Sequence, residues 1–283
     1  MSQSQPSRPP TPPEVAARYD AGVGRRRLGQ GTGRLEFART CEVIERYLPP
    51  APAVVLDVGG GPGVYACWLA RRGYEVHLVD AVALHVEQAR EASLCQPDHP
   101  LADATLGDAR LLDRPDGSAA AVLLLGPLYH LTDRADRLAA WREAHRVLAP
   151  GGVVLAAAVS RFASTLDGLR LGLFDDPVFA QVAERDLLDG QHRNPTGDAR
   201  YFTTAYFHGP GELREEAEEA GLRHEATLGV EGPGWLLQDF DCWWADAARR
   251  ERLLAVARAL ESEPALLGVS AHLLAVARKG EAR

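Results

Sequence analysis

Three glycines and two carboxylates in the first third of the chain are spaced in a way that could hold a nucleoside. Asp57 directly precedes a glycine-rich segment in which Gly59, Gly61 and Gly63 alternate with other residues. Glycines let a backbone approach a ligand closely, and a helix that begins after them offers free N–H groups. Asp80 follows Gly59 by about 20 residues, the spacing at which a carboxylate binds the two hydroxyls of a ribose. The first half of the chain is therefore predicted to bind a nucleoside.

Details of the glycine segment argue against two other kinds of nucleotide site. A dinucleotide site needs a glycine where Val64 stands, and a phosphate-binding loop would end in Gly-Lys-Ser or Gly-Lys-Thr, which this segment lacks. A carboxylate at position 57 would repel a pyrophosphate, but it suits a cationic ligand that carries an amine.

Hydrophobic runs around these residues predict the elements that position them. The runs alternate between strand and helix patterns, which is typical of a parallel sheet with helices on both faces. Strands are expected near residues 53–58, 75–79, 103–106, 119–125, 152–159, 222–229 and 271–278. Helices are expected near residues 34–48, 64–72, 133–148, 210–220 and 236–262.

Together these motifs resemble those of the class I S-adenosylmethionine-dependent methyltransferases. In that family an Asp-x-Gly-x-Gly-x-Gly segment, here residues 57–63, cradles the amino-acid end of the cofactor. An acidic residue that ends the second strand, here Asp80, binds the ribose. Residues 106–110 are similar to the family's third motif, in which Asp108 would bond the adenine amino group, and residues 148–152 are similar to the turn before the fifth strand.

The resemblance implies S-adenosyl-L-methionine as the cofactor. In relatives, N-terminal helices close over the cofactor, so Tyr19 and Arg34 are expected at its methionine end or at the substrate, with a plain surface position as the alternative for each. The residues that the resemblance assigns to the cofactor are Tyr19, Arg34, Asp57, Gly59, Gly60, Gly61, Gly63, Asp80, Ala81, Asp108, Ala109 and Leu125.

The resemblance also implies the architecture. An α/β, Rossmann-like, doubly wound sheet of seven strands is expected, with its last strand antiparallel, with N-terminal helices and with a cap inserted after strand 5. The expected divisions are a disordered tail at 1–13, a helical lead-in at 14–50, a cofactor-binding Rossmann-like core at 51–160, a substrate cap at 161–210 and completion of the core at 211–283.

The fourth strand runs into the segment Gly-Pro-Leu-Tyr-His at 126–130, at the sheet edge where ligands bind in open α/β folds. In the family this position faces the reactive methyl group, and methyl transfer mainly requires alignment of the acceptor and exclusion of water. His130 is the first candidate for a general base, and a hydrogen bond that only supports the loop is its alternative role. Tyr129 is expected to line the pocket or to orient the acceptor, and His208 is a second candidate base.

The cap is expected to supply the acceptor site. Its aromatic cluster contributes Tyr201 and Tyr206, and Trp235 on a later loop would form a wall of the pocket or only pack. The acceptor is therefore predicted to be an aromatic or heterocyclic small molecule, such as an indole- or phenol-containing natural product. No metal is expected, because Gly126 and Pro127 stand where metal-dependent relatives carry carboxylates.

Composition and charge limit which other partners and which cellular location are expected. The net charge of −8 speaks against nucleic acid, and the triplet at 25–27 (three arginines) indicates a solvated loop more than an anion site. No run approaches about 18 apolar residues, so no membrane span is expected. Four cysteines without a C-x-x-C pair favour a cytoplasmic protein. A homodimer stays open, as do a protein or RNA methyltransferase, a non-catalytic S-adenosylmethionine-binding protein and an NAD-dependent reductase.

Overall fold

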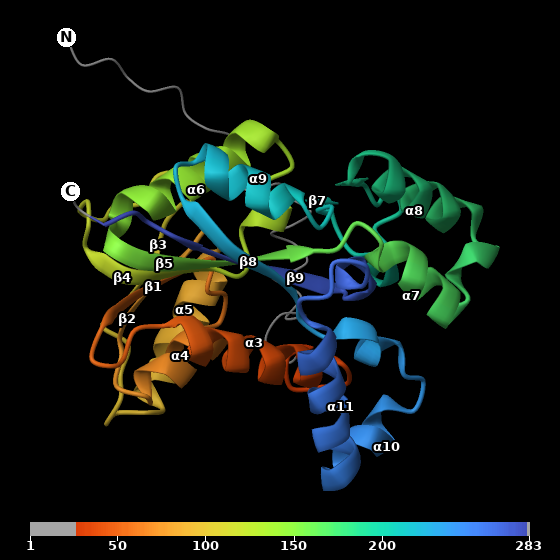
Figure 1. Ribbon diagram of the computed structural model, residues 1–283, viewed down its shortest axis with the longest axis horizontal. Coiled ribbons are helices and arrows are strands. Elements are labelled where there is room, and N and C mark those ends of the chain that lie inside the picture. Colours follow the sequence, from red (N-terminus) through yellow and green to blue (C-terminus); the bar gives the residue numbers. More distant parts are fainter. Residues whose placement is uncertain (1–26, 282–283) are drawn as a thin grey trace.

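A seven-stranded sheet forms the centre of the computed structural model, which describes residues 27–281 (Figure 1). The strand order is β3-β2-β1-β4-β5-β9-β8. Strands β1 to β5 run parallel, and β9 runs antiparallel to both of its neighbours. The strands are β1 (Val54–Val58), β2 (Glu75–Asp80), β3 (Asp103–Leu106), β4 (Ala119–Leu124), β5 (Leu148–Val159), β8 (Arg223–Gly229) and β9 (His272–Arg278). The predicted doubly wound sheet with an antiparallel last strand is confirmed.

Helices cover both faces of the sheet because successive strand residues point to opposite sides. Val55 of β1 packs into one buried core and Leu56 packs into the other. The helices that cover the first face are α3 (Gly33–Tyr47), α4 (Val64–Ala70) and α5 (Ala83–Leu94). Those that cover the second face are α6 (Arg134–Val147) and α9 (Glu212–Glu219). In Figure 1 the two sets lie below and above the sheet.

The strand registers bring the motif residues to one edge. Asp57 lies beside Leu78 of β2 and Leu123 of β4, and Asp80 lies beside Leu106 of β3. All four strands run in the same direction, so the segments that follow them leave the sheet at the same edge. The glycine turn, Asp80 and Asp108 are therefore neighbours in space although they are distant in the chain.

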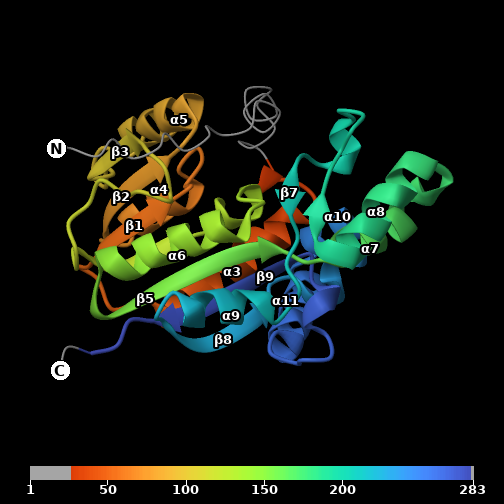
Figure 2. The same ribbon diagram turned by 90° about the horizontal axis from the view of Figure 1, so that it is seen from above.

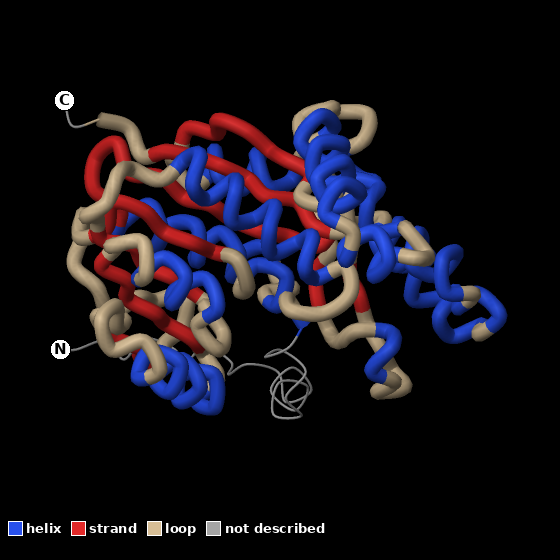
Figure 3. The backbone as a smooth tube through the Cα atoms, turned by 90° about the horizontal axis from the view of Figure 1, so that it is seen from below, coloured by secondary structure: helices blue, strands red, loops and turns tan. Residues whose placement is uncertain are grey.

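The segment between β5 and α9 forms a small module, which we call the α7–β7 module. Its elements are α7 (Ala163–Leu171), α8 (Pro177–Asp189), β6 (Gln191–His192) and β7 (Ala205–Tyr206). It has a buried cluster of its own, made of Leu173, Phe179, Ala183 and Tyr201. Helices α7 and α8 project beyond the sheet in each view (Figure 2 and Figure 3).

Two parts of the chain differ from the expected element pattern or lie outside it. The expected helix at 236–262 is broken into α10 (Phe240–Ala245) and α11 (Ala247–Leu260). Asp246 ends the first and caps the second, because its carboxylate accepts a hydrogen bond from the backbone N–H of Arg249 at 2.9 Å. The expected tail at 1–13, the part of the expected lead-in before residue 27 and Tyr19 lie outside the described residues.

Within residues 27–281, no helix combines the length and the apolar character that a membrane crossing needs.

Candidate active site

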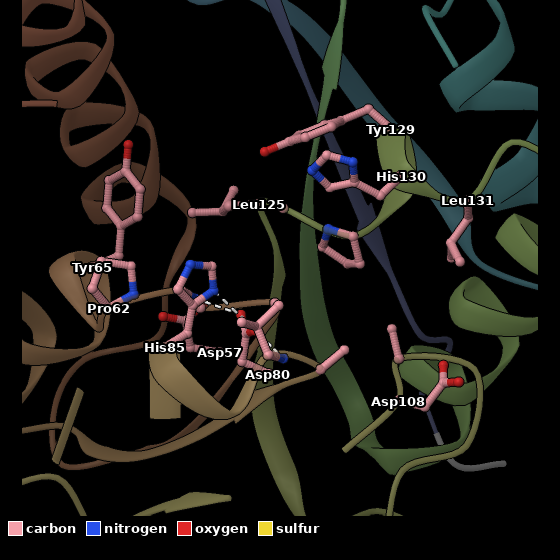
Figure 4. Close-up of a pocket in the computed structure, with 18 of the residues that line it drawn as sticks. Asp57, Pro62, Tyr65, Asp80, His85, Asp108, Leu125, Tyr129, His130 and Leu131 are labelled. Carbon is pink, nitrogen blue, oxygen red and sulfur yellow. Dashed lines mark hydrogen bonds and ion pairs between the residues drawn. The ribbon is translucent and has the colours of Figure 1, made fainter. Parts of the chain in front are cut away.

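A cavity of about 310 Å³ opens at the carboxyl edge of the parallel strands (Figure 4). Each of four neighbouring strands delivers residues to its wall: the glycine turn follows β1, Asp80 ends β2, Asp108 and Ala109 follow β3, and Leu125 follows β4. Ligands of open α/β sheets bind at this edge. The structure thus brings together the residues that the sequence motifs single out.

The glycine turn needs glycine at two positions for different reasons. Gly59 has a φ of +70°, and a Cβ there would lie 2.7 Å from Cδ of Pro127, so any side chain would push apart the turn and the loop after β4. Gly61 has a φ of +56°, and a Cβ there would meet nothing within 4 Å. Position 61 is therefore glycine for its backbone conformation, and the space beside it stays open for a ligand. Gly59, Gly60 and Gly61 line the cavity, and Gly63 leads into α4 behind it.

Asp57 is a fully buried carboxyl in the wall of this cavity. Neither of its oxygens has a hydrogen-bond partner among the described residues. Burial, and secondly the charge of Asp80, raise the pKa of Asp57 to about 7, and the nearby backbone N–H of Ala66 offsets this only in part. A buried carboxylate without a partner is costly, so the site favours a cationic ligand that would neutralise it.

Asp80 is held by three donors. Its Oδ2 accepts from the backbone N–H of Gly61 at 2.8 Å, and its Oδ1 accepts from the backbone N–H of Val82 at 2.9 Å. The third donor is Nδ1 of His85, which lies 3.1 Å from Oδ1. His85 comes from the first turn of α5, is only 5% exposed and lines the cavity. The sequence reasoning missed it; its position five residues after Asp80, one helical turn into α5, is the signal that could have found it.

Two further carboxylates, Asp108 and Asp136, line the cavity. The guanidinium of Arg110 donates to both oxygens of Asp108, through Nε at 2.9 Å and Nη2 at 2.6 Å. The Nη1 of Arg110 also donates to Asp136 at 2.8 Å. Asp108 and Ala109 both line the cavity, beside Arg110 and Asp136. This arrangement fixes the loop after β3 in a defined orientation.

Tyr129 and His130 line the cavity from the short helix η1 (Leu128–His130) that follows β4. Their rings lie 4.6 Å apart, and Figure 4 shows both side chains across the cavity from Pro62 and Tyr65. The backbone behind them is anchored from α6, where Nη1 of Arg137 donates to the carbonyl oxygens of Leu131 and Thr132 at 3.0 Å each. The loop that carries both predicted catalytic residues is therefore rigidly supported.

Arg34 does not reach the cavity, which corrects its expected place at the cofactor. It pairs with Asp241 and lies over the rings of Phe240 and Trp244, at 5.7 Å from each, because its face of α3 packs against α10. Arg27 lines the cavity instead. It belongs to the arginine triplet for which a solvated loop was the favoured interpretation, and it donates two hydrogen bonds to Glu36.

Glu36, which holds Arg27, is part of a buried charge network. Nδ1 of His272 lies 3.7 Å from Glu36 and 2.5 Å from Glu231. Burial opposes a charge on His272, but the carboxylates of Glu36 and Glu231 raise its pKa. Two carboxylates and one imidazole this close could hold a metal ion. Here Glu36 already accepts two hydrogen bonds from Arg27 and Glu231 already bonds His272, so the cluster fixes Arg27 at the cavity.

His208 is fully buried and does not line the cavity, which corrects its proposed role as a base. Its Nε2 lies 3.5 Å from Glu216 of α9, and burial lowers its pKa. Tyr206 packs against it edge to face at 4.8 Å, and the guanidinium of Arg137 lies 3.6 Å from the centre of the Tyr206 ring. His208 and Tyr206 therefore belong to the packing between β7, α6 and α9.

Tyr201 and Trp235 also lie outside the cavity wall, against the expectation that they bind the acceptor. Tyr201 packs on Phe179 within the α7–β7 module, and its hydroxyl donates to Asp176. The indole N–H of Trp235 donates to the carbonyl oxygen of Val269 at 2.8 Å. Aromatic side chains bury large apolar areas, and the module's own core takes Tyr201. The module touches the site through Phe202, whose ring stacks on His130 at 6.3 Å.

Comparison with known sequences identifies the central part of the chain. Residues 55–152 match the family described as "Methyltransferase domain". An uncharacterized methyltransferase of Mycobacterium tuberculosis is 34% identical over 128 residues, which are 44% of this chain and 49% of that protein. Methyltransferase GfsG of Streptomyces halstedii is 29% identical over 180 residues, 56% of this chain and 64% of that protein. The chain thus spans about half the length of the first of these relatives.

Comparison with solved structures shows the same fold over nearly the whole chain. An S-adenosylmethionine-dependent methyltransferase of Thermotoga maritima superposes with a TM-score of 0.59 at 16% identity, covering 94% of this chain and 98% of that one. The [4+2]-cyclase SpnF superposes with a TM-score of 0.54 at 19% identity, covering 87% of this chain and 81% of that one. Because one fold serves both a methyltransferase and a cyclase, the reaction must be argued from the site.

Proposed function

Since the chain belongs to the class I S-adenosylmethionine-dependent methyltransferases, we propose that it transfers the cofactor's methyl group to a small-molecule acceptor. The observation that carries the proposal is Asp57, a buried carboxyl without a partner among the described residues, beside a glycine turn that opens onto the cavity. The cofactor's amino-acid end carries an ammonium group, which supplies the missing charge. A nicotinamide dinucleotide would bring a pyrophosphate to the same carboxylate, which disfavours the reductase alternative.

The other residues of the cavity fit the rest of the cofactor. Asp80 would bind the ribose, and Asp108 with Ala109 would border the adenine. The guanidinium of Arg27, fixed by Glu36, would take the carboxylate of the amino-acid end. Arg34 was expected at this end of the cofactor or at the substrate. Bound S-adenosylmethionine supplies a methyl group on a sulfonium, which its positive charge already activates.

The chain's own residues would align the acceptor and exclude water. His130 would take a proton from the acceptor, and Tyr129 would orient it, both from the loop that Arg137 anchors. Tyr65, which also lines the cavity, has its pKa raised well above its ordinary value, mainly by burial and also by the charge of Glu36. Its phenol therefore stays protonated and can donate a hydrogen bond at neutral pH.

The acceptor proposed is an aromatic or heterocyclic small molecule. Tyr201, Tyr206 and Trp235 do not line the cavity and so do not support an aromatic acceptor. The proposal is supported instead by Tyr65 and Tyr129, which bring aromatic rings to the cavity wall. A volume of about 310 Å³ lies at the lower end of the range for small-molecule sites. A protein or RNA acceptor is the alternative, and the net charge of −8 speaks against RNA.

Calorimetric titration with S-adenosylmethionine, S-adenosylhomocysteine and NADH tests the proposal first. We expect micromolar binding of the two sulfur nucleosides and none of NADH. A panel of phenols, indoles and other heterocycles is then incubated with S-adenosylmethionine, and products are sought by mass spectrometry as a gain of one methyl group. Binding of NADH alone would overturn the proposal, and cofactor binding without any methylated product across broad acceptor classes would favour a non-catalytic binding protein.

A further inference from the structure

Phe202, through which the α7–β7 module contacts the candidate site, has a backbone conformation that side chains rarely adopt. Its φ is +66° and its ψ is −158°. Within residues 27–281, every other residue with a positive φ is a glycine. This region of the backbone map is open almost only to glycine, and another residue stays there only when its surroundings fix it. The fold therefore keeps a phenylalanine at a position that favours glycine.

Two side chains fix the peptide planes on either side of Phe202. Nε2 of His192 lies 2.5 Å from the carbonyl oxygen of Tyr201, and this nitrogen donates because a carbonyl oxygen only accepts. Nδ2 of Asn194 donates to the carbonyl oxygen of Phe202 at 2.8 Å. The orientation of the two planes sets φ and ψ of Phe202. These hydrogen bonds therefore supply the constraint that the strained conformation requires.

The module in turn holds His192. The imidazole is fully buried, and its Nδ1 lies 2.8 Å from Oδ2 of Asp186 in α8. The same oxygen accepts from the hydroxyl of Ser164 in α7 at 2.5 Å. The His192 ring also stacks on Phe207, with the ring centres 4.5 Å apart. A chain of contacts from α7, α8 and β6 thus ends at the backbone of Phe202.

The strained conformation brings the Phe202 ring to both aromatic residues of the candidate site. Its centre lies 6.3 Å from that of the His130 ring, with 17° between the planes. It lies 6.4 Å from the Tyr129 ring, with 57° between the planes. Aromatic rings at these separations attract one another. Tyr129 and His130 line the cavity and Phe202 does not, so Phe202 packs on the proposed base without occupying the cavity.

We propose that Phe202 is a positioning residue: its ring fixes the orientation of His130, and the strained backbone at position 202 places the ring there. The proposal rests on the proposed function, in which His130 takes a proton from the acceptor. Phe202 acts through His130 rather than on the acceptor. The α7–β7 module thereby takes part in the reaction through one side chain.

The first experiment observes His130 and needs neither cofactor nor acceptor. NMR of protein with isotope-labelled histidine rings records the Cε1–H signals, and His130→Gln identifies the signal of His130. Phe202→Leu keeps apolar volume but removes the flat ring. Loss of the ring shifts the His130 signal whatever its role, so the line width decides. We expect the signal to broaden, because the imidazole then samples more than one orientation.

Two variants control for the loss of an aromatic side chain from the module. Phe202→Tyr keeps the ring and should keep the sharp signal of His130. Phe179→Leu makes the same change elsewhere in the module, since Phe179 is buried, packs on Tyr201 at 5.1 Å and is absent from the cavity wall. It should also leave the signal of His130 sharp. Equal broadening in Phe179→Leu and Phe202→Leu would overturn the proposal.

Two further changes test whether the strained backbone places the ring. Asn194→Asp keeps the shape of the side chain but loses the hydrogen bond that Nδ2 donates to the carbonyl oxygen of Phe202. It should broaden the His130 signal although the Phe202 ring is intact. Phe202→Gly should unfold about 2–4 °C above Phe202→Ala, because glycine relieves the strain. A lower unfolding temperature for the glycine variant would contradict a strained position 202.

The second experiment uses the first phenol or indole of the acceptor panel that the wild type methylates. Phe202→Leu should lower kcat about tenfold, because the base is no longer held in place. Its affinity for S-adenosylhomocysteine should stay within about twofold of the wild type, since the contacts that hold the cofactor are unchanged. Phe202→Tyr should recover most of kcat, and Phe179→Leu should keep it. An unchanged kcat in Phe202→Leu would overturn the proposal.

The outcomes distinguish this proposal from the one it rests on. A wild-type protein that neither binds S-adenosylhomocysteine nor methylates any acceptor contradicts the proposed function, and the NMR experiment still decides whether Phe202 orients His130. A sharp His130 signal in Phe202→Leu contradicts only the role of Phe202. Thermal unfolding shows whether each variant folds, and the near-isosteric Asn194→Asp carries the test if Phe202→Leu does not fold.

Discussion

Replacing Asp57 by Asn should stabilise the ligand-free protein while it abolishes cofactor binding. The carboxyl is fully buried, and its pKa is raised from 3.8 to about 7. A raised pKa means that the folded state binds the proton more tightly than the unfolded state, so stability falls as the pH rises from about 4 to about 7. A shift of about three pKa units costs about 4 kcal/mol of folding stability at pH 8, where the buried carboxylate is charged.

The pH dependence of the stability gain reports on the carboxyl alone, because the side-chain amide of the Asp57→Asn variant does not titrate. At pH 5 the folded carboxyl is still protonated, and only about 1.5–2 kcal/mol of the cost is present. The stability gained by Asp57→Asn should therefore be larger at pH 8 than at pH 5 by about 2–3 kcal/mol. A constant penalty for burying the amide would lower both gains equally.

Urea unfolding of wild type and variant at the two pH values measures the difference. Asp103→Asn is the control of opposite sign, because hydrogen bonds from Arg114 and His77 lower the pKa of Asp103 despite its partial burial. That variant should lose stability at pH 8. If Asp57→Asn gains no more at pH 8 than at pH 5, the carboxyl is not desolvated and the argument for a cationic ligand at this site is refuted.

Four further outcomes are expected. Asp80→Ala should weaken S-adenosylhomocysteine binding by about 2–3 kcal/mol through lost hydrogen bonds to a charged acceptor, measured by calorimetry. Wild-type affinity for this ligand should fall about fivefold from pH 7 to pH 6, as Asp57 takes up a proton, and an affinity that stays constant over this range would contradict a charged Asp57 as the ligand's partner. Once an acceptor is found, His130→Ala should lower kcat far more than S-adenosylhomocysteine affinity; an equal loss of thermal stability would indicate a structural role. Arg137→Met leaves Glu216 buried without its partner at 2.8 Å and should cost about 3–5 kcal/mol in urea unfolding, and a loss under 1 kcal/mol would contradict that role.

The place where Asp57, the glycine turn and Asp80 meet could be predicted from the sequence because these parts are local. Asp57 and the glycines belong to one strand–turn–helix unit, and Asp80 ends the neighbouring strand. The sheet topology then fixes where such strand ends meet, whatever the rest of the chain does. Hydrophobic periodicity was enough to predict the positions of the seven strands, because the pattern of each segment depends on the burial of that segment alone.

Only the tertiary structure decided which side chains of helices and of the α7–β7 module reach the cavity. Arg34 turns away because Asp241, 207 residues further along the chain, lies against its face of α3. Tyr201 and Tyr206 fill interior packing positions, and Arg27 and His85 face the cavity instead. A helix or a loop can present any of its faces inward, and that choice depends on partners distant in the sequence, which no local pattern records.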